Sequence, residues 1–94
     1  MKVEQEIESK SVAYAKQNGF MNYKLDKLPG RKGVDQLFVG YLGACFFVEF
    51  KAPGKRPTKK QWAELDRLYR RGHTYYIVDS VSMFKRILSE HLHV

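Results

Sequence analysis

GVDQLFVGYLGACFFVEFK, residues 33–51, contains two apolar runs separated by a short segment bounded by glycines. Two β-rich runs joined in this way are typical of an antiparallel hairpin. With residues 41–43 as a three-residue loop, the register places Asp35 directly opposite Glu49. Opposed side chains in such a pair have Cβ atoms roughly 4.5–5.5 Å apart, and like charges at that distance repel each other.

Two acids and a lysine therefore meet at one end of the expected hairpin. Because strand side chains alternate between the two faces, Lys51 lies on the same face as Glu49. A divalent cation between Asp35 and Glu49 would turn their repulsion into binding. The alternative is that both acids are strand-end charges exposed to water, since a slip of one residue in register would separate them.

Chain-wide properties narrow the class of protein. With 94 residues, we expect a single domain, residues 1–94, with a core large enough to fold alone. No apolar run approaches the roughly 20 residues of a membrane span. The N-terminus has no signal region, so we expect a cytoplasmic protein, or one in the host cytoplasm if the chain is viral. The 17 Lys and Arg against 10 Asp and Glu give a net charge of +7, which suits a polyanionic partner.

Patterning along the chain predicts a helix, three strands in a meander, a helix, a strand and a helix. Apolar residues on both faces of the hairpin strands indicate a sheet covered on both sides, as in an α/β fold. We therefore expect the single Cys45 to be a small buried side chain. Thr58 and Gln61 match a capping box at the start of the second helix. The expected helices cover residues 3–18, 59–71 and 81–91, and the expected strands cover 21–25, 36–39, 44–50 and 74–78.

Helical periodicity predicts which side chains are buried. On the first helix we expect Val3, Ile7 and Tyr14 to face the core, with the acids Glu4 and Glu8 on a neighbouring face. Two acids four residues apart most simply indicate a solvated face. On the second helix the expected buried stripe consists of Trp62, Leu65, Leu68 and Tyr69.

These residues together resemble a known enzyme superfamily. Asp35, then Glu49-Phe50-Lys51 on the next strand, then a crossover helix, resemble the restriction-endonuclease-like PD-(D/E)XK core, a mixed four-stranded sheet flanked by helices in the order αβββαβα. The string VEFKAPGK, residues 48–55, followed by Gln61, is similar to the VRR-NUC (virus-type replication-repair nuclease) branch. That family has a proline before the aspartate where this chain has Val34, a difference that affects backbone stiffness more than chemistry.

The resemblance implies roles for the individual residues. Asp35 and Glu49 would hold Mg²⁺ or Mn²⁺, with the backbone carbonyl of Phe50 as a further ligand. Lys51 would orient the attacking water or neutralise the transition state. Gln61 would lie beside the site, and it also completes the capping box. The family has a metal-linked acid on the first helix, and both Glu4 and Glu8 fit that position.

A DNA-binding surface and a dimer are also implied. Basic side chains of the loop from Lys24 to Lys32, and of the segment before and at the start of the second helix, would contact phosphates. Stand-alone members of the family form homodimers that cut branched DNA. We expect surplus apolar surface near the C-terminus to form a two-fold interface. The expected DNA contacts are Lys27, Arg31, Lys32, Lys55, Arg56, Lys59 and Lys60, and the apolar residues are Tyr75, Tyr76, Val81, Met83, Phe84, Ile87 and Leu92.

The sequence thus favours a metal-dependent DNA endonuclease that prefers branched DNA such as four-way junctions. Two alternatives stay open: a non-catalytic nucleic-acid-binding module on the same fold, and a nuclease that cleaves RNA. A binding module has no use for Asp35 opposite Glu49, and its affinity for a polyanion should rise when either charge is removed. A cleavage assay with Mg²⁺ or Mn²⁺ against a chelator separates these functions.

Overall fold

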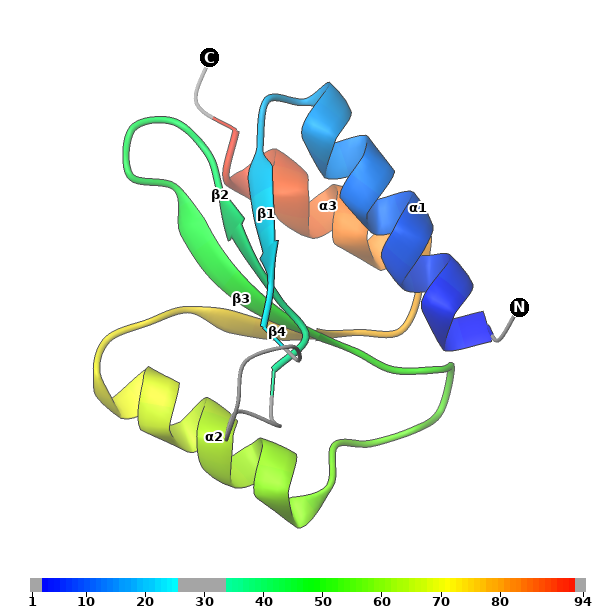
Figure 1. The fold of residues 1–94 in the computed structure, drawn as a ribbon, viewed down its shortest axis with the longest axis vertical. Helices are drawn as coiled ribbons and strands as arrows, with labels where there is room; N and C mark the ends of the chain where they lie inside the picture. The colour runs from blue at the N-terminus through cyan, green and yellow to red at the C-terminus, as the bar shows by residue number, and fades with distance from the viewer. Residues whose placement is uncertain (1–2, 26–33, 93–94) are drawn as a thin grey trace.

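A computed structural model describes residues 3–25 and 34–92, which form a four-stranded mixed sheet with helices on both faces (Figure 1). The strands lie in the order β1-β2-β3-β4. The first three are antiparallel, and β3 and β4 are parallel, as the crossover through α2 requires. The predicted element order is confirmed. The elements are α1 (Val3–Gln17), β1 (Met21–Lys24), β2 (Gln36–Val39), β3 (Cys45–Phe50), α2 (Lys59–Arg70), β4 (Tyr75–Val78) and α3 (Val81–Glu90).

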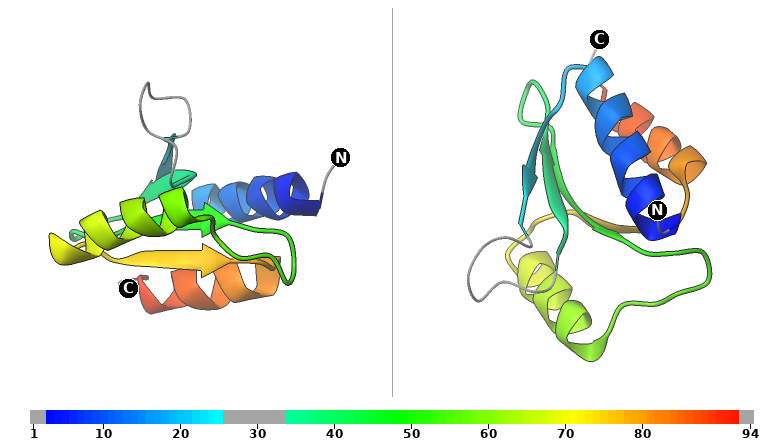
Figure 2. Two further views of the ribbon diagram at one scale, coloured as in Figure 1. Left: turned by 90° about the horizontal axis from the view of Figure 1, so that it is seen from below. Right: turned by 45° about the vertical axis from the view of Figure 1, so that its right-hand side comes forward.

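The helices divide unequally between the two faces of the sheet. Helices α1 and α3 pack side by side on one face, and α2 crosses the other (Figure 2). The better covered face carries the core, because the even-numbered residues of β2 and β3 point toward α1 and α3. Phe38 is fully buried, with its ring centroid 5.5 Å from that of Phe46 and 5.0 Å from that of Phe84 on α3.

The central hairpin has the register that the sequence predicts. Gln36 pairs with Val48, and the peptide N–H of Gly40 donates to the carbonyl of Ala44 at 2.7 Å across a three-residue loop. Leu42 and Gly43 turn this loop with positive φ angles of 58° and 81°, the left-handed conformation for which glycine carries little penalty. The regular strand pairing ends at Gln36 and Val48. Beyond it, the peptide N–H of Asp35 donates to the carbonyl of Val48 at 3.2 Å, so Asp35 is held at the end of the hairpin without a regular cross-strand pair with Glu49.

The predicted core face of α1 is partly wrong. Val3 is 55% exposed, whereas the buried residues of this helix are Ile7, Ser11 and Ala15. They follow an i, i+4, i+8 spacing, which also forms a single stripe. The small side chains at 11 and 15 let α1 lie close to its neighbours. Burial of this stripe brings the flank that carries Glu4 and Glu8 toward the sheet instead of leaving it in solvent.

Three predictions for the other face are also wrong. Cys45 is exposed, and so are Trp62 and Tyr69 of α2. These side chains are exposed because one short helix, α2, covers only part of this face of the sheet. Leu65 is the one fully buried residue of α2 among those described. Trp62 instead lies beside the guanidinium of Arg56, whose carbon is 5.8 Å from the ring centroid. In residues 3–25 and 34–92, no helix has the length and apolar character of a membrane-spanning segment.

The apolar residues near the C-terminus have a simpler explanation than a dimer interface. Phe84 and Ile87 are part of the core. Tyr76, Val81, Met83 and Leu92 pack against that core from α3 and its flanks. The expectation that they form surplus surface is therefore wrong for these residues, because α1 covers the side of α3 that the sequence left without a partner.

Candidate active site

Glu49 is the centre of the candidate site. It lies near the end of β3 and is 1% exposed, although the residue is a carboxylic acid. Its Oε2 accepts a hydrogen bond from Nε2 of Gln61 at 2.7 Å and lies 3.3 Å from Nζ of Lys51. Its Oε1 is buried and has no hydrogen-bond partner among the described residues. A buried carboxylate oxygen without a partner is costly, and such groups mark sites that lack an ion or a ligand.

The environment of Glu49 changes its acidity. Burial raises the pKa of Glu49 to about 8, and the nearby carboxylates of Asp35 and Glu4 act in the same direction. The ammonium group of Lys51 opposes this rise without cancelling it. The carboxyl group therefore binds a proton near neutral pH unless another positive charge takes its place.

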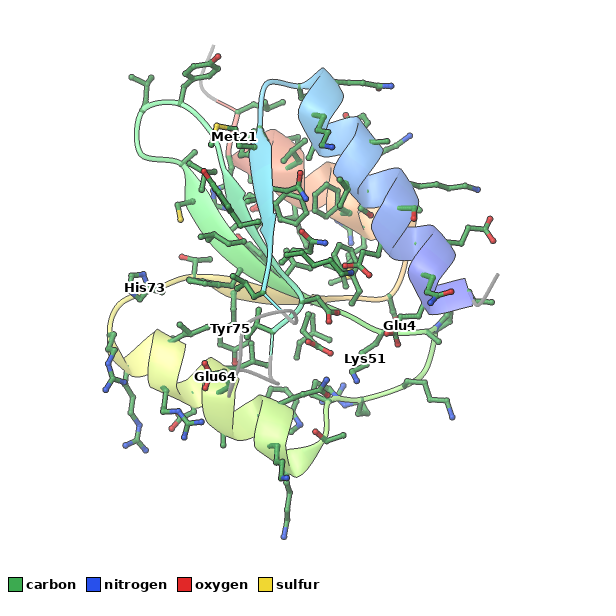
Figure 3. All side chains as sticks on the ribbon, in the orientation of Figure 1. Glu4, Met21, Lys51, Glu64, His73 and Tyr75 are labelled. Atoms are coloured by element: carbon green, nitrogen blue, oxygen red, sulfur yellow. The ribbon has the colours of Figure 1, made fainter. Side chains whose placement is uncertain are left out.

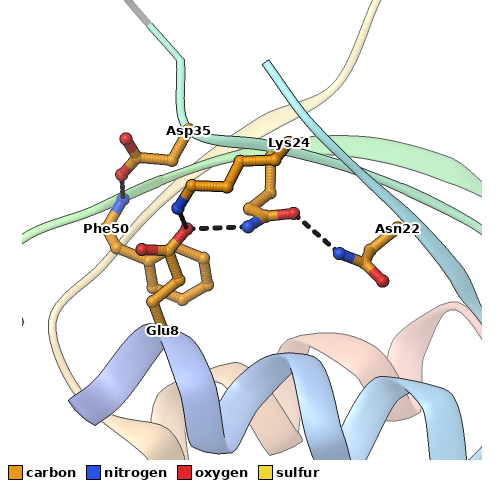
Figure 4. A network of polar contacts seen from close by, with 6 residues as sticks. Glu8, Asn22, Lys24, Asp35 and Phe50 are labelled. Carbon is orange, nitrogen blue, oxygen red and sulfur yellow. Dashed lines mark hydrogen bonds and ion pairs between the residues drawn. The ribbon is translucent and has the colours of Figure 1, made fainter. Parts of the chain in front are cut away.

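Asp35 is held beside the end of β3 by the backbone. Its Oδ2 accepts a hydrogen bond from the peptide N–H of Phe50 at 2.8 Å (Figure 4). The peptide N–H of Asp35 itself donates to the carbonyl of Val48 at 3.2 Å. The aspartate thus continues the β2–β3 pairing with its side chain, and this fixes one acid next to Glu49.

The two acids of α1 have different surroundings. Glu4 lies in the first turn, at the end of the helix that approaches the segment after β3, and Figure 3 shows it on the same side of the molecule as Lys51. It is also close enough to act on the ionisation of Glu49. Glu8 instead accepts hydrogen bonds at its Oε2, from Nζ of Lys24 at 3.0 Å and from Nε2 of Gln36 at 2.7 Å. Of the two sequence candidates, Glu4 joins the acidic group and Glu8 joins a polar network.

That network contains residues that the sequence did not single out. Gln36 is 3% exposed, and its Oε1 accepts a hydrogen bond from Nδ2 of Asn22 at 3.1 Å (Figure 4). The signal for Gln36 was available in the sequence: a polar residue occupies a core-facing position of an otherwise apolar strand. Its partner Glu8 is 28 residues away in the chain, so strand patterning could not identify the contact.

Lys51 and Gln61 approach Glu49 from two different elements. Lys51 follows β3 directly, and its side chain is 13% exposed. Gln61 is the third residue of α2, where the predicted capping box is present: Thr58 accepts from the N–H of Gln61, whose side chain accepts from the N–H of Thr58. Both expected roles of Gln61 are thus compatible, because its Oε1 serves the cap and its Nε2 reaches Glu49.

The expected phosphate-binding residues are only partly described. Lys55 and Arg56, in the segment before α2, and Lys59 and Lys60, in its first turn, are all exposed. Lys27, Arg31 and Lys32 lie outside the described residues. Lys24, at the start of the expected basic loop, is bound to Glu8.

The donor set suits a hard divalent cation. The carboxylates of Glu49, Asp35 and Glu4 offer oxygen ligands only, which Mg²⁺ and Mn²⁺ prefer, and the orphaned Oε1 of Glu49 gains a partner when a cation is present. In the part of the chain that the structure describes, no three acidic, histidine or cysteine side chains already form a metal cluster. The described residues thus offer oxygen donors of the kind such a cation prefers, without a preformed three-ligand site.

Comparisons with known proteins agree with this geometry. No family model matches the chain. A protein of Acyrthosiphon pisum secondary endosymbiont phage 1, named "Putative nuclease p44", is 41% identical over 78 residues, which are 82% of this chain and 83% of the phage protein. A solved structure named "VRR_NUC domain" superposes with a TM-score of 0.86 at 23% sequence identity, over 98% of this chain and 100% of the other. The sequence relationship and the shared fold lead to one conclusion: the chain belongs to the same family as the phage protein named "Putative nuclease p44" and has the fold of the VRR-NUC domain.

Proposed function

We propose that this nuclease is a metal-dependent DNA endonuclease that hydrolyses phosphodiester bonds at the centre formed by Asp35, Glu49 and Lys51. One observation carries the proposal: Glu49 is almost fully buried beside a second acid, yet one of its oxygens has no partner among the described residues. A protein that only bound DNA would gain affinity by losing these acids, because they repel phosphates.

Asp35, Glu49 and Glu4 would hold Mg²⁺ or Mn²⁺. The carbonyl of Phe50 is a further candidate ligand, because the N–H and C=O of a strand residue point toward the same neighbouring strand and this N–H already points at Asp35. When bound, the cation would supply positive charge for the scissile phosphate and make a water molecule more acidic.

The remaining side chains would bind and orient the reactants. Lys51 would donate a hydrogen bond to the scissile phosphate or to the attacking water, since its ammonium group lies at the edge of the acidic centre. Gln61 would fix the rotamer of Glu49 through its 2.7 Å hydrogen bond. The exposed cations Lys55, Arg56 and Lys59 would contact flanking phosphates without reading the base sequence.

We further propose a homodimer that cuts branched DNA, such as a four-way junction, in the cytoplasm. One domain has a single centre and can cut one strand at a time, whereas a two-fold dimer presents two centres to the paired strands of a junction. The support for an interface is the less covered sheet face, where Met21 is 54% exposed and Tyr23 is 49% exposed on β1, with exposed Cys45 on β3, the second strand along. Exposed apolar surface of this kind is typical of interaction sites.

A cleavage assay tests the proposal. The chain is incubated with linear, flapped and four-way DNA, and with RNA of the same sequences, in Mg²⁺, Mn²⁺ or a chelator. We expect metal-dependent cleavage of DNA, fastest on the junction. Binding without cleavage in any metal would instead support the non-catalytic module, and faster cleavage of the RNA substrates would support the RNA nuclease. Light scattering at micromolar concentration tests the dimer. A monomer that cuts duplex and junction equally fast would overturn the dimer and the junction preference, and would leave the proposed endonuclease activity standing.

A further inference from the structure

The hydrogen bonds of Glu8 connect three elements next to the acidic centre. Its carboxylate on α1 accepts from Gln36 on β2 at 2.7 Å and from Lys24 at the end of β1 at 3.0 Å. Lys24 and Gln36 are also paired in the β1–β2 register. Glu8 has a side-chain exposure of 15% and its bond with Gln36 is partly buried, whereas the side chain of Lys24 is 41% exposed. Partly buried, charge-assisted hydrogen bonds are among the strongest polar contacts in proteins.

Two members of this network, Glu8 and Gln36, are close in the chain to members of the acidic centre. Glu8 is four residues after Glu4, which is about one helical turn or 6 Å along the axis of α1. Gln36 directly follows Asp35 in the chain, and Asp35 is itself bonded to the backbone of β3. The bond between Glu8 and Gln36 therefore couples the position of the helical acid to the position of the strand acids.

Little else holds the beginning of α1 against the sheet. Val3 is exposed, and Glu6 is paired with Lys10 on the solvent side at 2.9 Å. Ile7 is the one buried residue in the described part of the first two turns, and it continues the stripe of Ser11 and Ala15 that sets which face of α1 turns to its neighbours. The bonds of Glu8 add a polar restraint at this end of the helix, because they form only when one flank of α1 faces the strands.

We propose that Glu8 is a positioning residue for the metal site: it fixes the rotation of α1 so that Glu4 can share a cation with Asp35 and Glu49. This rests on the proposed function, since it requires the metal site to exist. It also assigns different tasks to the two acids of α1, with Glu4 as the ligand and Glu8 as the anchor. Outer residues of this kind typically change metal affinity about 10- to 100-fold when they are removed.

The test measures Mn²⁺ binding to the DNA-free chain by calorimetry, so that the readout does not depend on cleavage. Glu8→Ala should weaken Mn²⁺ binding about 10- to 100-fold. Glu8→Gln should keep affinity within about threefold, because its amide oxygen still accepts a hydrogen bond from Gln36. The matched control is Glu6→Ala, which removes the same charge from the same helix at an exposed ion pair and should leave affinity unchanged. The double variant Glu4→Ala/Glu8→Ala should bind no more weakly than Glu4→Ala alone.

One further variant and the comparison of the two Glu8 variants keep the outcomes distinct. Gln36→Met retains the charge of Glu8 but removes the amide N–H of residue 36 that donates to it. Weakened Mn²⁺ binding by this variant supports the positioning role of Glu8, and unchanged Mn²⁺ binding overturns that role. This variant also serves if Glu8→Ala does not fold. Glu8→Gln that binds as weakly as Glu8→Ala would show that the charge itself is needed, and Glu8 would then be a ligand. A wild-type chain without Mn²⁺ binding would overturn the proposed function together with this inference, whereas wild-type affinity in a folded Glu8→Ala variant would overturn this inference alone.

Discussion

Gln61 donates a hydrogen bond of 2.7 Å from Nε2 to Oε2 of Glu49, while its Oε1 accepts from the backbone N–H of Thr58 at 2.9 Å. One side chain therefore caps α2 and orients the buried acid of the candidate site. The first turn of α2 is thereby tied to the end of β3, two elements that the sequence separates by eight residues.

The capping role of Gln61 and its contact with Glu49 can be distinguished by mutation. Gln61→Ala loses both side-chain contacts, whereas Thr58→Ala loses the other bond of the capping box, from the N–H of Gln61 to Oγ1 of Thr58, and keeps the contact with Glu49. Each variant should lose about 1 kcal/mol of stability from the cap. Only Gln61→Ala should also slow cleavage, by about 10- to 100-fold, as removal of a residue that orients a metal ligand does. Cleavage rates measured well below both melting temperatures check this expectation, and equal rates for the two variants would contradict the orienting role.

Glu49 should make the metal-free chain less stable as pH rises. Its pKa is raised in the folded state from 4.5 to about 8, so between these values the folded chain binds about one more proton than the unfolded chain. The free energy of unfolding then falls with increasing pH across this window. Glu49→Gln removes the ionisation and should remove this part of the pH dependence.

Urea denaturation in chelator from pH 5 to pH 9 measures that difference between wild type and Glu49→Gln. Glu6→Gln is the control, because Glu6 is an exposed acid paired with Lys10. The same proton should be released when Mn²⁺ binds, so metal affinity should increase with pH up to about 8. A wild type whose stability does not change relative to Glu49→Gln over this range would show that Glu49 titrates normally.

The sequence was sufficient for the hairpin and the capping box because both depend on local pattern. A three-residue loop fixes the register, so Gln36 could be placed opposite Val48, and Asp35 near Glu49 at the end of the hairpin, without tertiary information. The Thr58–Gln61 cap likewise depends on a spacing of three residues. The same locality explains why Lys51 was correctly expected beside Glu49, whereas the position of Gln61 beside Glu49 was expected from the family resemblance.

The errors concern contacts between elements that are distant in the chain. Cys45 is exposed because α2 covers only part of its face, and helix coverage depends on helix length and crossing position rather than on strand pattern. Glu4 and Glu8 could not be distinguished because only their partners on the sheet differ. Gln36 was overlooked as a partner because a buried amide identifies a need for hydrogen bonds without identifying the group that meets it.

The lysines at the start of α2 should affect stability and DNA binding in opposite directions. Lys59 and Lys60 are exposed in a first turn that has no acidic residue, where positive charge opposes the helix dipole. Lys59→Ala/Lys60→Ala should therefore stabilise the fold slightly, by about 0.3–1 kcal/mol per lysine at low salt. If both contact phosphates, the slope of log K against log salt should become less steep by about 1.8 for duplex DNA.

The matched control for these lysines is Arg67→Ala/Arg70→Ala. These cations lie nearer the other end of the same helix and are paired with Glu64 and Asp66 at 2.9 Å. They should change the salt slope little. Fluorescence anisotropy at several salt concentrations gives both slopes, and equal slopes for the two double variants would place the DNA elsewhere on the chain.

The acidic centre should act as a unit. Asp35→Asn, Glu49→Gln and Lys51→Met each remove one charge and keep approximate side-chain size, and Asp35→Asn keeps an oxygen that can accept from the N–H of Phe50. We expect the cleavage rate of each single variant to fall by about a thousandfold or more, nearly as far as that of the triple variant. The reason is that the effects of mutating groups that stabilise the same transition state are not additive. DNA binding should persist, since removal of an acid reduces repulsion of phosphates. Single-turnover cleavage and anisotropy measured on the same folded samples test both statements, and a single variant with wild-type turnover would remove that residue from the mechanism.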